Sequence, residues 1–436
     1  MLEDIPEEVL TTIVSCLAVP NGPLIAEDPY RRPDIKRYPL GWNGQPLTLS
    51  QLCLTSKKLR RIAEPVLYRT FPSIYLGKLR WFLRSIIARP YLATFVEEVC
   101  FEDFDTRAHY EDSDRDPMPM PEEFGCFFKQ AMMSLQPPSD LATEWASVFD
   151  EGIEDAEVAL LVSLCPNLGM IDFTLPWVLE DSILYKVVMQ RCLAISAGSL
   201  QPASLIGQRL SRLREVNIRG FDCNCFSSDD FFCFMRLPTL DTFRLPYYLD
   251  CNRPGPMQMS HSIKHISFVD CWLSSSNLCA QLRTWPNLES LELHWAEGHP
   301  YRSQEDIRVQ TLDFTAIGEC LRLNNTQLKR LKIDPVEPHN IGMRRFHGKL
   351  GSLVELDKLR NLAIPDTEIF GIGGLATDDA LPHSLTELNI LPTFWNPDGP
   401  NDCKNYEIES LQETWRQRGS SLGVRVICTR QNGKPW

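Results

Sequence analysis

The sequence lacks the features that would mark an exported or membrane-spanning chain. The first residues are acidic (Glu3, Asp4, Glu7, Glu8), whereas a secretory signal begins with basic residues. The longest purely apolar runs, such as residues 158–162, are far too short to cross a bilayer. We therefore expect no membrane partner and a location in the cytoplasm, the nucleus or both.

The sequence also lacks a disulfide framework, although it has 15 cysteines. They are scattered along a chain without a signal peptide, which favours free thiols in a reducing compartment. The closest group is Cys223 and Cys225, with Cys233, His261 and His265 further on. Zinc sites usually space paired ligands by two to four residues and add a second pair. We expect buried or half-buried thiols and no metal.

Recognisable catalytic motifs are missing as well. Residues 371–374 contain three glycines but not the Lys and Ser/Thr of a phosphate-binding loop, and no Gly-x-Ser-x-Gly elbow is present. The net charge of −13 argues against a nucleic-acid partner, because phosphate contacts require clustered Lys and Arg. We expect no catalytic residue and no cofactor. A hydrolase or transferase would need a deep pocket with converging titratable groups.

An amphipathic helix is predicted at the N-terminus, over residues 3–17. Asp4 and Glu7 resemble a capping pair, and Pro6 suits a first helical turn. The protein's own core or another polypeptide must cover the apolar stripe. The apolar positions are Ile5, Val9, Leu10, Ile13, Val14 and Leu17.

A second helical block follows a long loop. Residues 18–46 are rich in Pro and Gly and have no period. The segment LTLSQLCLTSKKLRRIAEPVLYRTF then shows helical spacing, and Pro65 is predicted to kink or restart the helix.

These two segments together resemble an F-box. IPEEVL, with Ile13 and Leu17, is similar to its opening helix, and LSQLCLTSKKLRRIAEPVLYRTF is similar to its second half, in the form found in filamentous fungi. The resemblance covers residues 1–71 and departs from the family in the length of the 18–46 loop. It implies docking on the Skp linker of Skp–cullin–F-box ubiquitin ligases, and through it on a cullin and a RING protein. The positions that match the contact motif are Ile5, Pro6, Val9, Leu10, Ile13, Leu52 and Leu54.

The remainder of the chain repeats one short pattern, apolar-x-x-apolar-x-apolar. Steps between successive copies are 27 (213 to 240), 23 (240 to 263), 25 (263 to 288) and 26 residues (359 to 385). Leucine-rich repeats have periods of 20–29 residues. The nine copies begin at Val96, Leu168, Leu213, Leu240, Ile263, Leu288, Leu328, Leu359 and Leu385.

Each copy is predicted to form a strand, and helix signals lie between copies, such as Ser276 before Leu278 and the pair Ile317 and Leu321. LGVRVICTR reads as a last strand. The predicted fold class is α/β: an F-box-like helical domain (1–71) followed by an irregular leucine-rich-repeat solenoid (72–436). Its curved parallel sheet would lie inside and its helices outside. An acidic insertion interrupts the array at about residues 102–125.

The alternation along each strand predicts which side chains line the concave face. As a set they are the candidate surface for a target protein, although for any single residue simple solvation is the more ordinary role. The predicted residues are Glu215, Asn217, Arg219, Arg244, His265, Glu292, His294, Arg330 and Lys332, with Thr242, Ser267, Ser290 and Asp334 beside them.

Two functions follow. In the first, the chain is a non-catalytic substrate-recognition subunit of a Skp–cullin–F-box ligase, which binds the linker through the N-terminal helices and an unknown target through the repeats. In the second, it is a repeat scaffold outside ubiquitination, whose N-terminal helices cap the apolar end of the solenoid.

Overall fold

The computed structural model describes residues 5–17, 45–73, 78–101, 120–175, 182–196, 210–220, 234–235, 237–246, 260–271, 273–295, 311–335, 345–365, 381–391 and 424–428. The chain forms two compact units, Met1–Phe221 and Asp222–Trp436. The units divide at residue 221, so the helical block and the first strands share a unit. The predicted domains, 1–71 and 72–436, stay a prediction.

Unit 1 begins with a bundle of three helices, α1 (Glu7–Ser15), α2 (Gln45–Thr55) and α3 (Lys57–Arg69). A small core holds the bundle together, and Ile5, Leu17, Leu52, Cys53, Val66 and Leu67 pack partly against it. The predicted loop at 18–46 lies outside the described residues up to residue 44. The core consists of Leu10, Val14, Leu49, Leu59, Ile62 and Ala63.

The structure bears on where the helices of this bundle begin and break. Pro6 is the N-cap of α1 rather than a residue of its first turn, and it makes no side-chain capping bond. Asp4 lies outside the described residues, so the Asp4/Glu7 capping pair stays a prediction, while Glu7 pairs with Arg61 of α3. The helix does not restart at Pro65, which lies inside α3. The break comes at Ser56, whose Oγ accepts a hydrogen bond from the backbone N–H of Leu59 at 3.2 Å.

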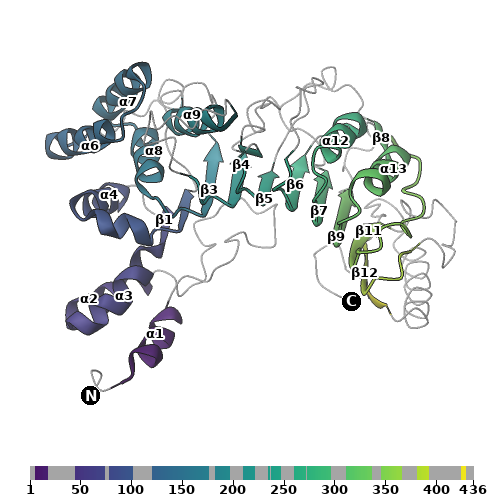
Figure 1. Ribbon diagram of the computed structural model, residues 1–436, viewed down its shortest axis with the longest axis horizontal. Helices are drawn as coiled ribbons and strands as arrows, with labels where there is room; N and C mark the ends of the chain where they lie inside the picture. The colour runs from purple at the N-terminus through teal and green to yellow at the C-terminus, as the bar shows by residue number, and fades with distance from the viewer. Residues whose placement is uncertain are drawn as a thin grey trace, which may run out of the picture. The chain divides into compact units, whose positions relative to one another are not determined.

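Four parallel strands follow in unit 1, and they pair in chain order β1-β2-β3-β4. Helices lie on one side of these strands (Figure 1). The strands are β1 (Thr70–Ser73), β2 (Glu98–Phe101), β3 (Met170–Leu175) and β4 (Glu215–Gly220). The other elements are α4 (Lys78–Ala88), the 3-10 helix η2 (Pro90–Phe95), α6 (Glu122–Ser134), α7 (Ser139–Glu151), α8 (Glu154–Leu164) and α9 (Ile183–Ser196).

Part of the predicted acidic insertion is helical. Residues 102–119 lie outside the described residues, but Pro121 is the N-cap of α6 and Glu122 and Glu123 occupy its first turn. Acidic residues at the start of a helix interact favourably with its dipole. Residues 122–125 of the predicted insertion therefore lie in a helix, and the bounds of the insertion stay a prediction.

Unit 2 contains a longer parallel sheet with the strand order β5-β6-β7-β9-β11-β12-β13. Helices α12 (Ser275–Leu282) and α13 (Phe314–Asn324) lie on one side of it (Figure 1). Two short strands, β8 (Thr311–Asp313) and β10 (Arg345–His347), form a separate parallel pair. The sheet strands are β5 (Thr242–Pro246), β6 (His265–Cys271), β7 (Ser290–Trp295), β9 (Arg330–Pro335), β11 (Asn361–Pro365), β12 (Glu387–Leu391) and β13 (Arg425–Cys428).

The repeat prediction is confirmed strand by strand. Each of the nine copies contains a strand that begins two residues after its first apolar residue, and the predicted last strand is β13. Register pairs identical positions of consecutive copies, such as Phe243 with Ile266 and Leu291 with Leu331. The described chain is thus an α/β protein with an open parallel sheet in each unit and the leucine-rich-repeat pattern along its strands.

Neighbouring repeats in unit 2 are tied together on the helix side. Asn325 is fully buried, and its Nδ2 donates to the carbonyls of Leu282 (3.3 Å) and Trp285 (2.9 Å). Arg322 of α13 donates to the carbonyls of Leu350 (2.7 Å) and Ser352 (3.1 Å). These bonds join each helix to a neighbouring repeat, and the carbonyls of Leu282 and Trp285 also accept backbone hydrogen bonds from Trp285 and Leu288.

Candidate functional site

The N-terminal bundle leaves part of its apolar surface uncovered. Leu10 and Val14, four residues apart on α1, enter the core, whereas Val9 and Ile13 are 47% and 50% exposed. On α2, Leu47 and Leu54 are 62% and 76% exposed. We call Val9, Ile13, Leu47 and Leu54 the aliphatic set. Isolated surface leucines are ordinary, but four large aliphatic side chains exposed on two short helices of one small bundle are candidate contact residues.

The structure sorts the seven predicted linker contacts into two groups. Leu10 is a core residue, and Ile5 and Leu52 are half-buried against the core. Pro6, Val9, Ile13 and Leu54 are exposed. Leu47 was missed, although its position two helical turns before Leu54 places it on the same side of α2. That spacing is a signal that the sequence already contains.

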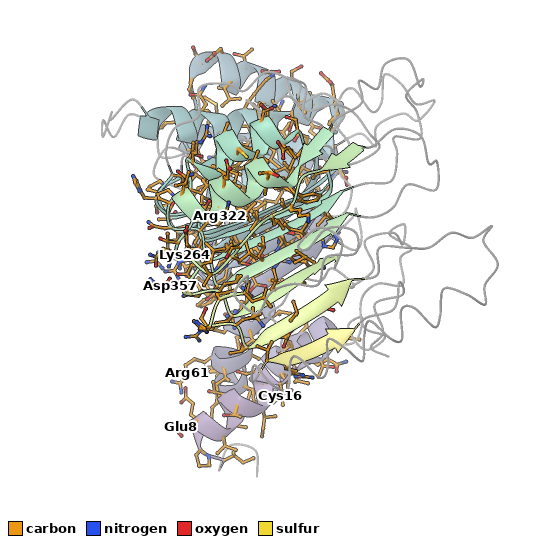
Figure 2. The ribbon with its side chains drawn as sticks, turned by 90° about the vertical axis from the view of Figure 1, so that its right-hand side faces the viewer. Glu8, Cys16, Arg61, Lys264, Arg322 and Asp357 are labelled. Carbon is orange, nitrogen blue, oxygen red and sulfur yellow. The ribbon has the colours of Figure 1, made fainter. Side chains whose placement is uncertain are left out.

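Polar contacts fix α1 against α3, so the exposed residues are held on a defined support. Lys58 Nζ donates to the carbonyl of Ile5 at 2.9 Å. Arg61 pairs with Glu7, and Figure 2 shows Arg61 and Glu8 on the same side of the bundle. The Arg61–Glu7 pair is solvent-exposed, so it orients α1 more than it stabilises it.

The second candidate surface is the polar face of the unit 2 sheet. Register places most of the predicted residues of unit 2 in two rows across the strands, opposite the buried apolar positions, and pairs His294 with Asp334 one position further along. The first row is Thr242, His265, Ser290, Arg330, Asn361, Glu387 and Arg425. The second row is Arg244, Ser267, Glu292, Lys332, Ala363, Asn389 and Ile427.

Four predicted residues form a hydrogen-bonded group at the middle of this face. Glu292 Oε1 lies 2.9 Å from Lys332 Nζ and 3.0 Å from His294 Nε2, and Ser267 Oγ donates to Glu292 Oε2 at 3.1 Å. Burial favours the protonated form of Glu292, but the His294 hydrogen bond and the Lys332 charge outweigh it, so the pKa of Glu292 lies well below its usual range. The carboxylate is ionised and its charge is compensated locally.

His265 differs from these residues because it contributes no charge at neutral pH. Burial and the neighbouring Arg330 cation both lower the pKa of His265. The strand prediction for residues 263–268 is confirmed at His265, which lies in β6, so His261 and His265 are not on one turn of a helix. Within the described residues, no group of three His, Cys, Asp or Glu side chains is placed to hold a metal ion.

A third row was not predicted, and we call it the entry column because its residues directly precede the strands. Backbone hydrogen bonds link its members in order, such as Glu289 N–H to Lys264 O and Lys329 N–H to Glu289 O. The sequence signal is simple: each member follows the first apolar residue of a copy. The entry column is Asp241, Lys264, Glu289, Lys329, Arg360 and Thr386.

The remaining predicted residues lie in unit 1, on β4. Asn217 is buried and donates from Nδ2 to Glu215 Oε1 at 3.1 Å. Arg219 pairs in register with Thr174 of β3. Glu215 and Asn217 therefore form a local pair, and the burial of Asn217 makes it a poor contact residue for a partner.

The described residues also include one surface depression and several cysteines that could in principle serve a chemical role. An open depression of about 550 Å³ in unit 1 is lined by apolar side chains such as Ile86, Phe127 and Leu135, with Thr94, Gln130 and Ser134 as its polar members. The eight cysteines whose side chains the structure describes are free, whereas Cys223, Cys225, Cys233 and residues 371–374 lie outside the described residues. No described helix is long and apolar enough to cross a membrane.

Comparisons with known proteins add a structural likeness at low similarity. No protein-family model and no curated protein matches the chain. An internalin from Listeria monocytogenes matches with a TM-score of 0.21 and 11% identity, over 46% of this chain and 49% of that chain. The match thus spans about half of the internalin. The repeat architecture rests on the register, burial and spacing of this chain's own strands.

Proposed function

We propose that the chain is a non-catalytic adaptor that brings a target protein to a Skp–cullin–F-box ubiquitin ligase in the cytoplasm or nucleus. The single observation that carries this proposal is the aliphatic set on a supported three-helix bundle whose sequence resembles an F-box. An apolar centre of this kind suits a stable interface, which buries roughly 800 Å² on each partner.

The mechanism is proximity. The bundle holds the linker, and through it the cullin and RING protein, while the polar face of the sheet holds the target. Target lysines then meet the ubiquitin-charged enzyme at a raised effective concentration, and this chain performs no bond chemistry.

Substitutions in the aliphatic set test the proposal. We expect Val9→Asp/Ile13→Asp and Leu47→Asp/Leu54→Asp each to reduce recovery of a purified Skp linker at least tenfold, because a buried charge at an apolar interface is costly. The matched control is Thr11→Asp/Thr12→Asp, which adds the same charge at exposed positions of α1. Recovery that is equal in all four proteins would refute the proposed hook.

Leu10→Asp is unsuitable as a binding variant and serves as a folding reference. Leu10 is 2% exposed in the bundle core, so an aspartate there disrupts folding whatever the linker does. Circular dichroism of each variant separates the two effects, since the surface variants should retain the wild-type spectrum.

A repeat scaffold outside ubiquitination is the second candidate, and one observation favours it. The bundle packs directly on the first repeat: α3 runs into β1, Arg69 Nε lies 2.8 Å from Glu97 Oε2, and the rings of Phe71 and Phe82 are 4.7 Å apart. The helices thus cover an end of the array whether or not they bind a linker. Deleting residues 1–71 would remove part of β1, so the surface variants discriminate better.

A further inference from the structure

The three polar rows of unit 2 carry an excess of positive charge, although the whole chain has a net charge of −13. The described side chains of the entry column and the two rows include seven Lys or Arg and four Asp or Glu. The cations are Lys264, Lys329, Arg360, Arg330, Arg425, Arg244 and Lys332, and the anions are Asp241, Glu289, Glu387 and Glu292.

Two of the four anions are neutralised from within the face. Lys329 Nζ lies 2.7 Å from Glu289 Oε2, and Lys332 Nζ lies 2.9 Å from Glu292 Oε1. Lys264, Arg330 and Arg360 are exposed, and no ion pair to another described residue holds them. Figure 2 shows Lys264 at the edge of the sheet where the strands begin.

The spacing of these cations suits an extended chain that crosses the strands. Arg330 lies on β9 and pairs in register with Asn361, which directly follows Arg360. Lys264 precedes β6, two strands away from β9 in the sheet. Adjacent strands are about 4.8 Å apart, so the cations recur at intervals of about 5–10 Å, comparable with the ~7 Å between same-side residues of an extended peptide.

We propose that this face binds an acidic, extended polypeptide segment of the target, with Lys264, Arg330 and Arg360 as its main anion-binding residues. This inference adds to the proposed function and rests on it only in describing the bound segment as part of a target protein. Charge complementarity identifies the occupant, and the Ser290 hydroxyl and the Asn361 amide of the first row can hydrogen-bond to a peptide backbone.

A nucleic acid suits the face less well. None of the three rows contains Phe, Tyr or Trp, so single-stranded bases would find no aromatic ring in these rows on which to stack. The anions Asp241 and Glu387 would also repel a continuous phosphate backbone, whereas a peptide can present uncharged residues to them.

Fluorescence anisotropy with the full-length chain tests the proposal. The probes are a labelled Glu/Ser peptide of about ten residues, enough to cross the seven strands when extended, and the same peptide with Gln in place of Glu. We expect binding of the Glu peptide at low ionic strength, weakening as salt is added, and at least tenfold weaker binding of the Gln peptide.

The discriminating variant is Arg330→Glu/Arg360→Glu, which should weaken binding of the Glu peptide at least tenfold. Its control, Lys57→Glu/Lys349→Glu, makes the same charge change at exposed residues outside the three rows and should bind normally. Equal loss in both variants, no loss in either, or tighter binding of poly(U) than of the Glu peptide would overturn the proposal. Because linker recovery is measured separately on unit 1 variants, failure here is distinguishable from failure of the proposed hook.

Discussion

At the scale of the residue, Asn325 joins two repeats with one side chain. Its amide donates to two carbonyls of the preceding repeat while the residue itself is fully buried. Removing the amide deletes both hydrogen bonds between the repeats and leaves a void in the buried space that the side chain filled, although the two carbonyls keep their backbone donors.

We therefore expect Asn325→Ala to lower the free energy of unfolding of unit 2 by about 1–3 kcal/mol. Urea denaturation followed by tryptophan fluorescence measures the change, since Trp285 is buried beside Asn325. Thr326→Ala, at an exposed neighbouring position, should leave the midpoint nearly unchanged. A similar midpoint for both variants would contradict this role of Asn325.

Glu157 in unit 1 makes stability depend on pH in an unusual direction. Burial raises the pKa of Glu157 to about 7 despite the ion pair with Arg80 at 2.7 Å. Between its ordinary value near 4.3 and about 7, the folded state retains a proton that the unfolded state has released. The contribution of Glu157 to stability is thus greatest below about pH 4 and is lost as pH rises through 7.

Glu157→Gln should remove this component. From about pH 5 to pH 8, we expect the free energy of unfolding of the wild type to fall, relative to that of the Gln variant, by on the order of 2–3 kcal/mol. Asp155, whose pKa burial raises to about 6, acts in the same direction in both proteins and cancels in the comparison. If the wild type and the Gln variant differ in free energy of unfolding by the same amount at pH 5 and at pH 8, Glu157 is ionised at both pH values and the prediction is wrong.

At the scale of the element, Gly318 lets helix α13 approach the next repeat closely. A Cβ atom at Gly318 would lie 2.0 Å from the carbonyl oxygen of Leu350. The obstacle is backbone, so a side-chain rotation cannot relieve the clash.

Gly318→Ala should accordingly destabilise unit 2 by about 1–3 kcal/mol, although alanine is the better helix former. Gly125→Ala in α6 is the matched control: its nearest neighbour, Met120 Cγ, is 3.4 Å from the added Cβ, and we expect no loss of stability. Thermal unfolding by circular dichroism compares the two. An unchanged or raised melting temperature for Gly318→Ala would mean that α13 moves away at little cost.

The strands were predictable from the sequence because their pattern is local. In each copy, the alternation of apolar and polar residues fixes which side faces the core, so both polar rows followed from it. The helices of unit 1 were harder. In α8, every residue from Asp155 to Ser163 is buried, so no polar face distinguishes it from a buried strand. Helices α4, α6, α7 and α9 were not predicted either.

The aliphatic set was only half predictable for a related reason. Helical spacing defines the direction in which a side chain points from its helix. Whether another helix packs against that side and buries it is decided by tertiary packing. Val9 and Leu10 have the same chemistry and adjacent positions, yet only Leu10 meets α3 in the core. Similarly, which cations of the three rows stay unpaired depends on which lysines form ion pairs with Glu289 and Glu292.

At the scale of the whole molecule, the two candidate surfaces belong to different compact units. The aliphatic set lies in unit 1, and Lys264, Arg330 and Arg360 lie in unit 2. An adaptor requires both surfaces to work at once, and separate cores allow each to be altered alone.

We therefore expect the two activities to separate in a cross-test. Val9→Asp/Ile13→Asp should bind the Glu peptide with wild-type affinity, and Arg330→Glu/Arg360→Glu should recover the linker fully. Adding saturating linker should leave peptide anisotropy binding curves unchanged. Competition between linker and peptide would place both on one surface and exclude the adaptor arrangement.

The parallel, in-order pairing of strands has a consequence for how such a chain diversifies. Successive strands can start 23 residues apart, as from Thr242 to His265, or 72 apart, as from Glu98 to Met170, and still pair in register. The pairing of neighbouring strands therefore does not depend on the length of the segment that connects them. Natural variation can thus lengthen the connection between two strands without changing how the strands pair.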